Sequence, residues 1–230
     1  MQLTIDIFND RVREVELCFE AVSQLYDTQK SFSESYTFHN DDFLKMLKAN
    51  TLMMIYNLVE SSMIGGILEI YDQVKTIGLS YNDVCSEIRG IWFTYKFNQV
   101  YDKNAHYNSY KDKALEIING IVNNDVIELN RKAADICGNL DAEAIRQVCR
   151  DHGIAFIIDD GCRGGVVLSD VKDKRNCLAH GTISFVECGC EYSLDELQRI
   201  KAEAVLFLNG LLDGMKLYYD NQKYLLARTQ

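Results

Sequence analysis

The sequence Leu-Ser-Asp-Val-Lys-Asp-Lys-Arg-Asn-Cys-Leu-Ala-His-Gly, residues 168–181, lies between two helical patterns and carries a charge where an apolar side chain is expected. Leu168, Val171 and Leu178 recur at the spacing of one helix face and form an apolar stripe. Arg175 occupies the position of that stripe between Val171 and Leu178. Because burying a guanidinium without a partner is very costly, Arg175 is either a paired structural ion or part of an active site assembled at an interface.

The regions on both sides of this stretch repeat apolar residues at helical spacing, which predicts an all-α chain. Downstream, residues 193–196 have the pattern of a capping box and begin a long last helix that extends to about Leu225. Upstream we predict a helix over residues 10–27, a long helix from Asp41 to about Lys75 with Gly78 just past its end, and a third helix that opens at a capping box over residues 80–83. A polar stretch around Asp102 to Tyr110 then precedes a shorter helix that ends near Asn123, and a further helix runs from a cap at residues 139–141 through Arg150 to Gly153. Loops are expected at residues 31–40 and 184–192, and the apolar run 154–158 is either a very short strand or an extended connector.

The composition is that of an ordinary globular protein with long helices. The chain has 230 residues, of which 47% are hydrophobic and 25% are charged, and it contains no proline. Because proline interrupts helix interiors, its absence favours long uninterrupted helices. No repeat or linker divides the chain, so we predict a single all-helical domain over residues 1–230, with a core at about 40–225 and an N-terminal helix within 1–30 that packs on it.

Cysteine content, hydropathy and net charge indicate in which cellular compartment the protein works and which kinds of partner it can bind. Eight cysteines without a signal peptide predict a reduced, cytoplasmic protein, although a disulfide framework would use the same residues. The longest apolar stretches are too short to span a membrane, so no membrane association is expected. The net charge of −10 argues against non-specific coating of nucleic acid, so any contact with RNA requires a small local basic site.

Helix geometry restricts how the polar residues of the first stretch can meet. Asn176 and His180 are four residues apart and share a helix face, whereas Arg175 and His180 are five apart and point about 140° away from each other. They can converge only if the last turn unwinds at Gly181 or if a second copy of the helix packs against the first. The second possibility predicts a symmetric dimer.

This Arg-Asn-x3-His arrangement, followed by a long last helix, resembles the HEPN superfamily, whose ribonucleases carry an Arg-x4-6-His motif. Two further segments, residues 56–61 (Tyr-Asn-Leu-Val-Glu-Ser) and 138–141 (Gly-Asn-Leu-Asp), resemble one subfamily of small, stand-alone prokaryotic HEPN proteins. The resemblance extends from about residue 40 to 225. It implies a helical bundle with long second and last helices that dimerises, so that two motifs line one cleft.

The resemblance also implies metal-independent cleavage of RNA, without a metal or cofactor, in a toxin or defence protein that has a cognate antitoxin. His180 would act as general acid or base, Arg175 would stabilise charge on the phosphoryl oxygens, and Asn176 would orient the phosphate or the histidine. Glu60 and Asn57 are expected to support this site, since both lie on a polar track of an otherwise apolar helix. The residues expected to contact RNA or its phosphates are Arg163, Lys172 and Lys174.

Structural roles compete with each of these assignments. Arg175 would be a core-edge ion paired with Glu60 or Asp173, His180 would cap a helix, and the polar track would be a satisfied layer in the bundle. The cysteines near His180, among them Cys188 and Cys190, lack the usual spacing of a zinc site. The whole chain would then be a non-catalytic HEPN-like module that binds nucleotide, RNA or protein, or a plain helical scaffold.

Overall fold

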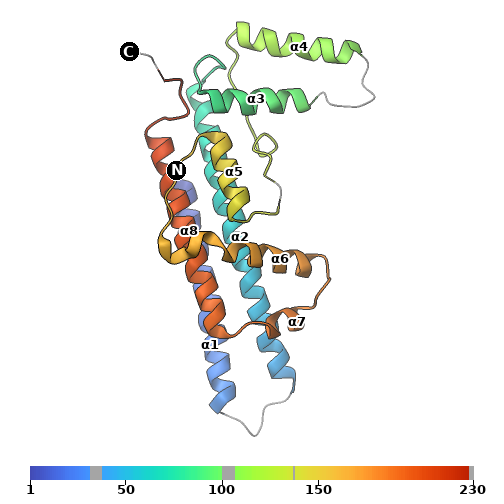
Figure 1. Ribbon diagram of the computed structural model, residues 1–230, viewed down its shortest axis with the longest axis vertical. Helices are drawn as coiled ribbons and strands as arrows, with labels where there is room; N and C mark the ends of the chain where they lie inside the picture. The colour runs from blue at the N-terminus through green and yellow to red at the C-terminus, as the bar shows by residue number, and fades with distance from the viewer. Residues whose placement is uncertain (32–37, 100–106, 137, 228–230) are drawn as a thin grey trace.

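The computed structural model describes residues 1–31, 38–99, 107–136 and 138–227, and its regular structure in these ranges is entirely helical (Figure 1). The helices are α1 (Gln2–Ser31), α2 (Phe38–Ile77), α3 (Ser86–Asn98), α4 (Tyr107–Val122), α5 (Ala142–His152), the 3-10 helix η1 (Asp160–Gly165), α6 (Val167–Ala179), α7 (Phe185–Cys190) and α8 (Leu194–Asp220). Two isolated β-bridges join Ser80 to Val126 and Val84 to Leu225, and no strand forms within the described ranges. The predicted all-α class is confirmed.

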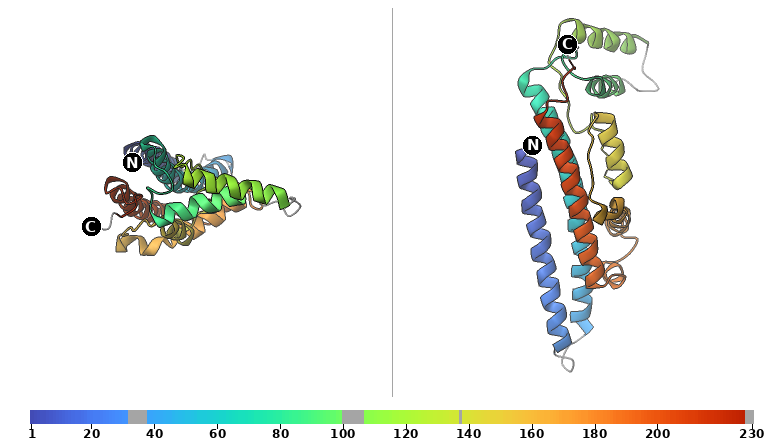
Figure 2. Two further views of the ribbon diagram at one scale, coloured as in Figure 1. Left: turned by 90° about the horizontal axis from the view of Figure 1, so that it is seen from above. Right: turned by 60° about the vertical axis from the view of Figure 1, so that its left-hand side comes forward.

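Three long helices, α1, α2 and α8, run side by side along the length of the molecule (Figures 1 and 2). α1 runs antiparallel to α2, and α8 packs against both. α5, η1, α6 and α7 lie along one side of this bundle, while α3 and α4 lie across one end (Figure 1). The N-terminal helix therefore packs on the bundle through both α2 and α8.

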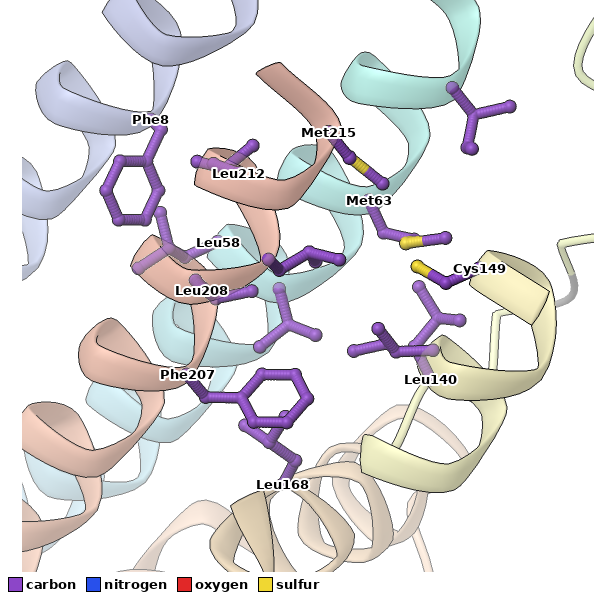
Figure 3. Packing of buried hydrophobic residues seen from close by; sticks show 14 of the residues in the cluster. Phe8, Leu58, Met63, Leu140, Cys149, Leu168, Phe207, Leu208, Leu212 and Met215 are labelled. Carbon is purple, nitrogen blue, oxygen red and sulfur yellow. The ribbon is translucent and has the colours of Figure 1, made fainter. Parts of the chain in front are cut away.

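The core is built where α2 meets its neighbours (Figure 3). α2 contacts α1, α6, α7 and α8, so it is buried around much of its circumference. Such a helix must be apolar on most faces, and among the described residues α2 is the only helix long and apolar enough to cross a membrane. Of its most apolar window 61% is buried inside the protein, as in the central helix of a bundle. The side chains that meet in Figure 3 include Phe8, Leu58, Met63, Leu140, Leu168, Phe207 and Leu212.

Most predicted helix ends are confirmed by their capping geometry. Gly78 follows α2 in the left-handed region at φ 77°, and Gly153 ends α5 at φ 71°. The Asp141 side chain accepts the Ala144 backbone N–H and so begins α5. Ser193 begins α8 with a complete capping box, as its sequence predicts.

The capping box predicted at residues 80–83 is wrong. Its polar groups do bond to one another, since Ser80 donates its N–H and its hydroxyl to the Asp83 carboxylate at 2.9 and 2.6 Å. They close a turn, however, and α3 begins only at Ser86. Val84, which follows this turn, forms a β-bridge to Leu225, and the N-cap of α3 is therefore Cys85.

The loop predicted at residues 184–192 is also wrong, because α7 forms there with its own capping box from Ser184 to Glu187. α7 packs along α2, and Gly189 makes that approach possible: a Cβ on Gly189 would lie 1.9 Å from the carbonyl oxygen of Lys45. A helix of only six residues is too short to give a clear periodic signal. Its position depends on a tertiary contact.

The structure defines two boundaries in or next to α8, the nature of residues 154–158 and the end of α8 itself. Residues 154–158 form no strand and are an extended connector. This connector lies against Gly210 and Gly214, where an added Cβ would collide with the backbone of Ile157 and with Phe156. α8 ends at Asp220, short of the predicted Leu225, because the following residues turn back and Leu225 bridges to Val84.

His152 provides a pH-dependent contribution to the stability of this bundle. Its side chain is buried, with Nδ1 2.7 Å from the Val148 carbonyl and Nε2 2.6 Å from the Tyr71 hydroxyl. A carbonyl only accepts, so Nδ1 carries a proton, and in the neutral ring Nε2 accepts from the Tyr71 hydroxyl. Burial lowers the pKa of His152 below its ordinary value of 6.5.

We expect the protein to lose stability as the pH falls below the unfolded-state pKa of about 6.5 towards the lower folded-state pKa, with a limiting slope of about 1.4 kcal/mol per pH unit from His152. Between the two pKa values, the imidazole of His152 binds a proton in the unfolded chain but not in the folded chain. Urea midpoints of the wild type and His152→Gln, compared at about pH 7.5 and 5.5, measure this effect. Equal losses in the two proteins would contradict it.

Candidate active site at the end of α6

α6 ends where the sequence places the glycine. His180 is the C-cap, and its backbone N–H donates to the Asn176 carbonyl at 3.0 Å. Gly181 then adopts φ 68°, which lets the Thr182 N–H reach the Cys177 carbonyl at 2.9 Å. The last turn closes in this way and leaves the side chain of His180 exposed, with no hydrogen-bond partner in the described part of the chain.

Arg175 is held by four different groups. Its guanidinium lies over the Tyr56 ring at 3.9 Å and donates to the carbonyl of Gly138. It also donates to the Asn176 side-chain oxygen at 2.8 Å and lies 3.6 Å from a carboxylate oxygen of Glu60. The side chain is only 19% exposed, so the charge in the apolar stripe is partly buried and paired. Of the two partners considered for a structural Arg175, Glu60 is the one that pairs with it, whereas Asp173 lies 3.6 Å from Lys172.

Asn176 extends this network to the loop that precedes α5. Its side-chain nitrogen donates to the Asn139 side-chain oxygen at 2.7 Å. The same loop is fixed from α2, because the Tyr56 hydroxyl accepts the Leu140 backbone N–H at 3.2 Å. Residues 138–140 therefore clamp the Arg175–Asn176 pair between α2 and α6.

The two supporting residues expected on α2 have different surroundings. Glu60 is shared: one carboxylate oxygen faces Arg175 and the other lies 2.9 Å from Arg131. The Asn57 side chain is exposed and makes no hydrogen bond within the described residues, although its backbone carbonyl accepts from Arg11 at 3.4 Å. Glu60 thus belongs to the network around Arg175, whereas Asn57 borders it.

The three residues expected to contact phosphate are each paired with a carboxylate. Lys172 lies 2.8 Å from Asp141, Lys174 lies 2.5 Å from Glu191, and Arg163 lies 2.8 Å from Glu203. The hydrogen bond to Asp141 raises the pKa of Lys172, and the bond to Glu191 raises that of Lys174. The Asp141 pKa is lowered first by the Ala144 backbone N–H that it accepts and then by Lys172. Arg163 lies beyond the N-terminal end of α6, away from His180.

The side chains of the motif separate into two groups. Those of Arg175 and Asn176 enter the network with α2 and residues 138–140, while the side chain of His180 makes no hydrogen bond with either of them among the described residues. For Arg175 and His180 this separation follows from their five-residue spacing on a regular helix. Within the described ranges, no group of three or more His, Cys, Asp or Glu side chains is arranged to hold a metal ion.

The sequence reasoning did not assign Asn139, Arg131 or the ring of Tyr56 to the site. Tyr56 and Asn139 fall within segments that carry the family resemblance, which was the only signal for them. Arg131 lies in a non-helical segment with no periodic pattern. These contacts join segments distant in sequence.

In comparison with known protein families, the chain matches the model of a family described as MAE_28990-like HEPN over residues 3–224, nearly the whole chain. No curated protein and no solved structure matches.

Proposed function

The chain belongs to the HEPN family, and from this premise we propose that it is a metal-independent endoribonuclease whose active site is completed by a second copy of the chain. The observation that carries the proposal is that the end of α6 presents both a held Arg175–Asn176 pair and the exposed side chain of His180. Arg175 and Asn176 are fixed in position by α2 and residues 138–140, and an exposed imidazole follows on the same helix. Phosphoryl transfer requires a cation and a group that can exchange a proton, and this end of α6 carries both.

The reaction follows from these residue types. A ribose 2′-OH loses its proton to a general base and attacks the adjacent phosphorus, the bond to the 5′-oxygen breaks, and that oxygen takes a proton from a general acid. The products are a 2′,3′-cyclic phosphate and a 5′-OH. His180 serves as general acid or base, Arg175 stabilises charge on the phosphoryl oxygens, and Asn176 orients Arg175 through the 2.8 Å hydrogen bond between them.

In a dimer, the side chains of His180 and Arg175 from different subunits can lie close together. Since His180 does not contact its own Arg175, a two-fold axis near the end of α6 would bring His180 of one copy to Arg175 of the other. In this arrangement the protein acts as a cytoplasmic toxin or defence ribonuclease held in check by a cognate antitoxin. Light scattering tests the assembly: a monomer at micromolar concentration would remove the composite site.

A non-catalytic binding module is the second candidate, and the saturation of Arg175 favours it. The guanidinium is engaged by Glu60, Gly138, Asn176 and the Tyr56 ring, so a phosphate must compete with protein groups for it. Such a module would bind RNA or nucleotide without turning it over.

Cleavage of diverse RNAs in EDTA separates the two candidates. We expect the wild type to cleave without added metal and to leave 2′,3′-cyclic phosphate ends, which chemical end-group analysis identifies. Binding without cleavage would support the module. Activity that vanishes in EDTA would contradict the metal-free mechanism.

A further inference from the structure

Arg131 lies outside the Arg-Asn-x3-His motif but contacts the carboxylate that holds Arg175. It belongs to the non-helical segment between α4 and α5, and its Nη2 is 2.9 Å from Oε1 of Glu60. The other oxygen, Oε2, lies 3.6 Å from Arg175. The two guanidinium groups therefore meet on opposite oxygens of a single carboxylate.

This sharing leaves positive charge at the site. Two guanidinium groups and one carboxylate carry a net charge of +1. Lys172 and Lys174, by contrast, each have a carboxylate of their own, Asp141 and Glu191, which neutralises the charge of the lysine. In a chain with a net charge of −10, the group formed by Arg131, Glu60 and Arg175 is a local positive site of the kind that RNA contact requires.

The fold does not need the Arg131 side chain. Its turn is held by Asn130, whose side chain accepts the Lys132 N–H at 2.9 Å and donates to the Tyr95 hydroxyl at 2.6 Å. The Arg131 side chain is 59% exposed, and an ion pair so close to solvent contributes little to stability. A guanidinium has five N–H donors, and the hydrogen bond described for Arg131 is the one from Nη2 to Glu60.

We propose that Arg131 is a substrate-binding residue that contacts the RNA backbone at a phosphate next to the one held by Arg175. This inference rests on the proposed function. A guanidinium binds phosphate with paired hydrogen bonds, and Arg131 is close enough to Arg175 for the two to contact neighbouring phosphates of one strand. The contact is made equally in the bound state and in the transition state, so it governs affinity and KM and leaves kcat unchanged.

The test compares Arg131→Gln with Arg150→Gln, a matched control. Arg150 is 53% exposed and pairs with Glu143 at 2.7 Å on α5, outside the network around Arg175. Binding is measured by fluorescence anisotropy with a mixed-sequence single-stranded RNA that is 2′-O-methylated and so cannot be cleaved, over a range of salt concentrations. For Arg131→Gln we expect roughly three- to tenfold weaker binding and a slope of log affinity against log salt that is shallower by about 0.7. KM for cleavable RNA rises by the same factor, and Arg150→Gln matches the wild type.

Two results would overturn the inference while the ribonuclease proposal stands. One is a wild type that cleaves RNA beside an Arg131→Gln variant with unchanged affinity and salt slope. The other is a fall in kcat at unchanged affinity, which assigns Arg131 the indirect role of positioning Arg175 through Glu60. A wild type that neither binds nor cleaves RNA would overturn both proposals.

Discussion

Replacing His180 with alanine is expected to reduce RNA cleavage by about 10²- to 10⁴-fold, the range for loss of a general acid or base, and to leave the melting temperature unchanged. The side chain is exposed and makes no hydrogen bond within the described residues, so its removal leaves no cavity and no unsatisfied buried group. Initial rates of cleavage and thermal melts of the purified variant measure the two effects. A helix-capping histidine would show the opposite pattern, with lower stability and retained cleavage.

Mixing two inactive variants tests whether the site is shared between subunits. In a composite dimer of His180→Ala with Arg175→Ala, one site combines the intact Arg175 of the first subunit with the intact His180 of the second. Random exchange at equal amounts places half of the chains in such dimers, so about a quarter of the wild-type activity returns. A site contained within one subunit would stay inactive in every mixture.

The sequence predicted those features that depend on local spacing. Periodicity and capping patterns predict the helices, the cap at Ser193 and the end of α6 just before Gly181. The position of Arg175 within an apolar stripe predicts that its charge is paired, and Glu60 is the partner. Glu60 was found because it interrupts an apolar helix.

The remaining contacts depend on which segments meet in space. The carbonyl of Gly138 and the side chain of Asn139 reach α6 only because the Leu140 N–H is fixed by Tyr56 of α2. No sequence pattern within α6 or within residues 138–140 predicts the contact between them. For the same reason the turn at Ser80 was mistaken for a helix start, because Val84 just after it pairs with the distant Leu225 and α3 begins only at Ser86.

Gly189→Ala is expected to have the largest effect on the fold, with a loss of about 3 kcal/mol of unfolding free energy, at the upper end of overpacking. The new Cβ would lie 1.9 Å from the Lys45 carbonyl oxygen, and backbone on both sides cannot give way as a flexible side chain would. α7 must therefore move away from α2. Because α7 begins soon after His180, its displacement shifts the loop that carries the imidazole, and cleavage falls together with stability.

Gly90→Ala is the matched control for this substitution. Gly90 lies inside α3 with no atom within 4 Å of an added Cβ, so alanine there should stabilise the protein by roughly 0.5–1 kcal/mol through helix propensity. Urea unfolding measures both variants. If Gly189→Ala unfolds at the wild-type midpoint, the contact between α7 and α2 is not tight in solution, and the loop carrying His180 is then positioned by α6 alone.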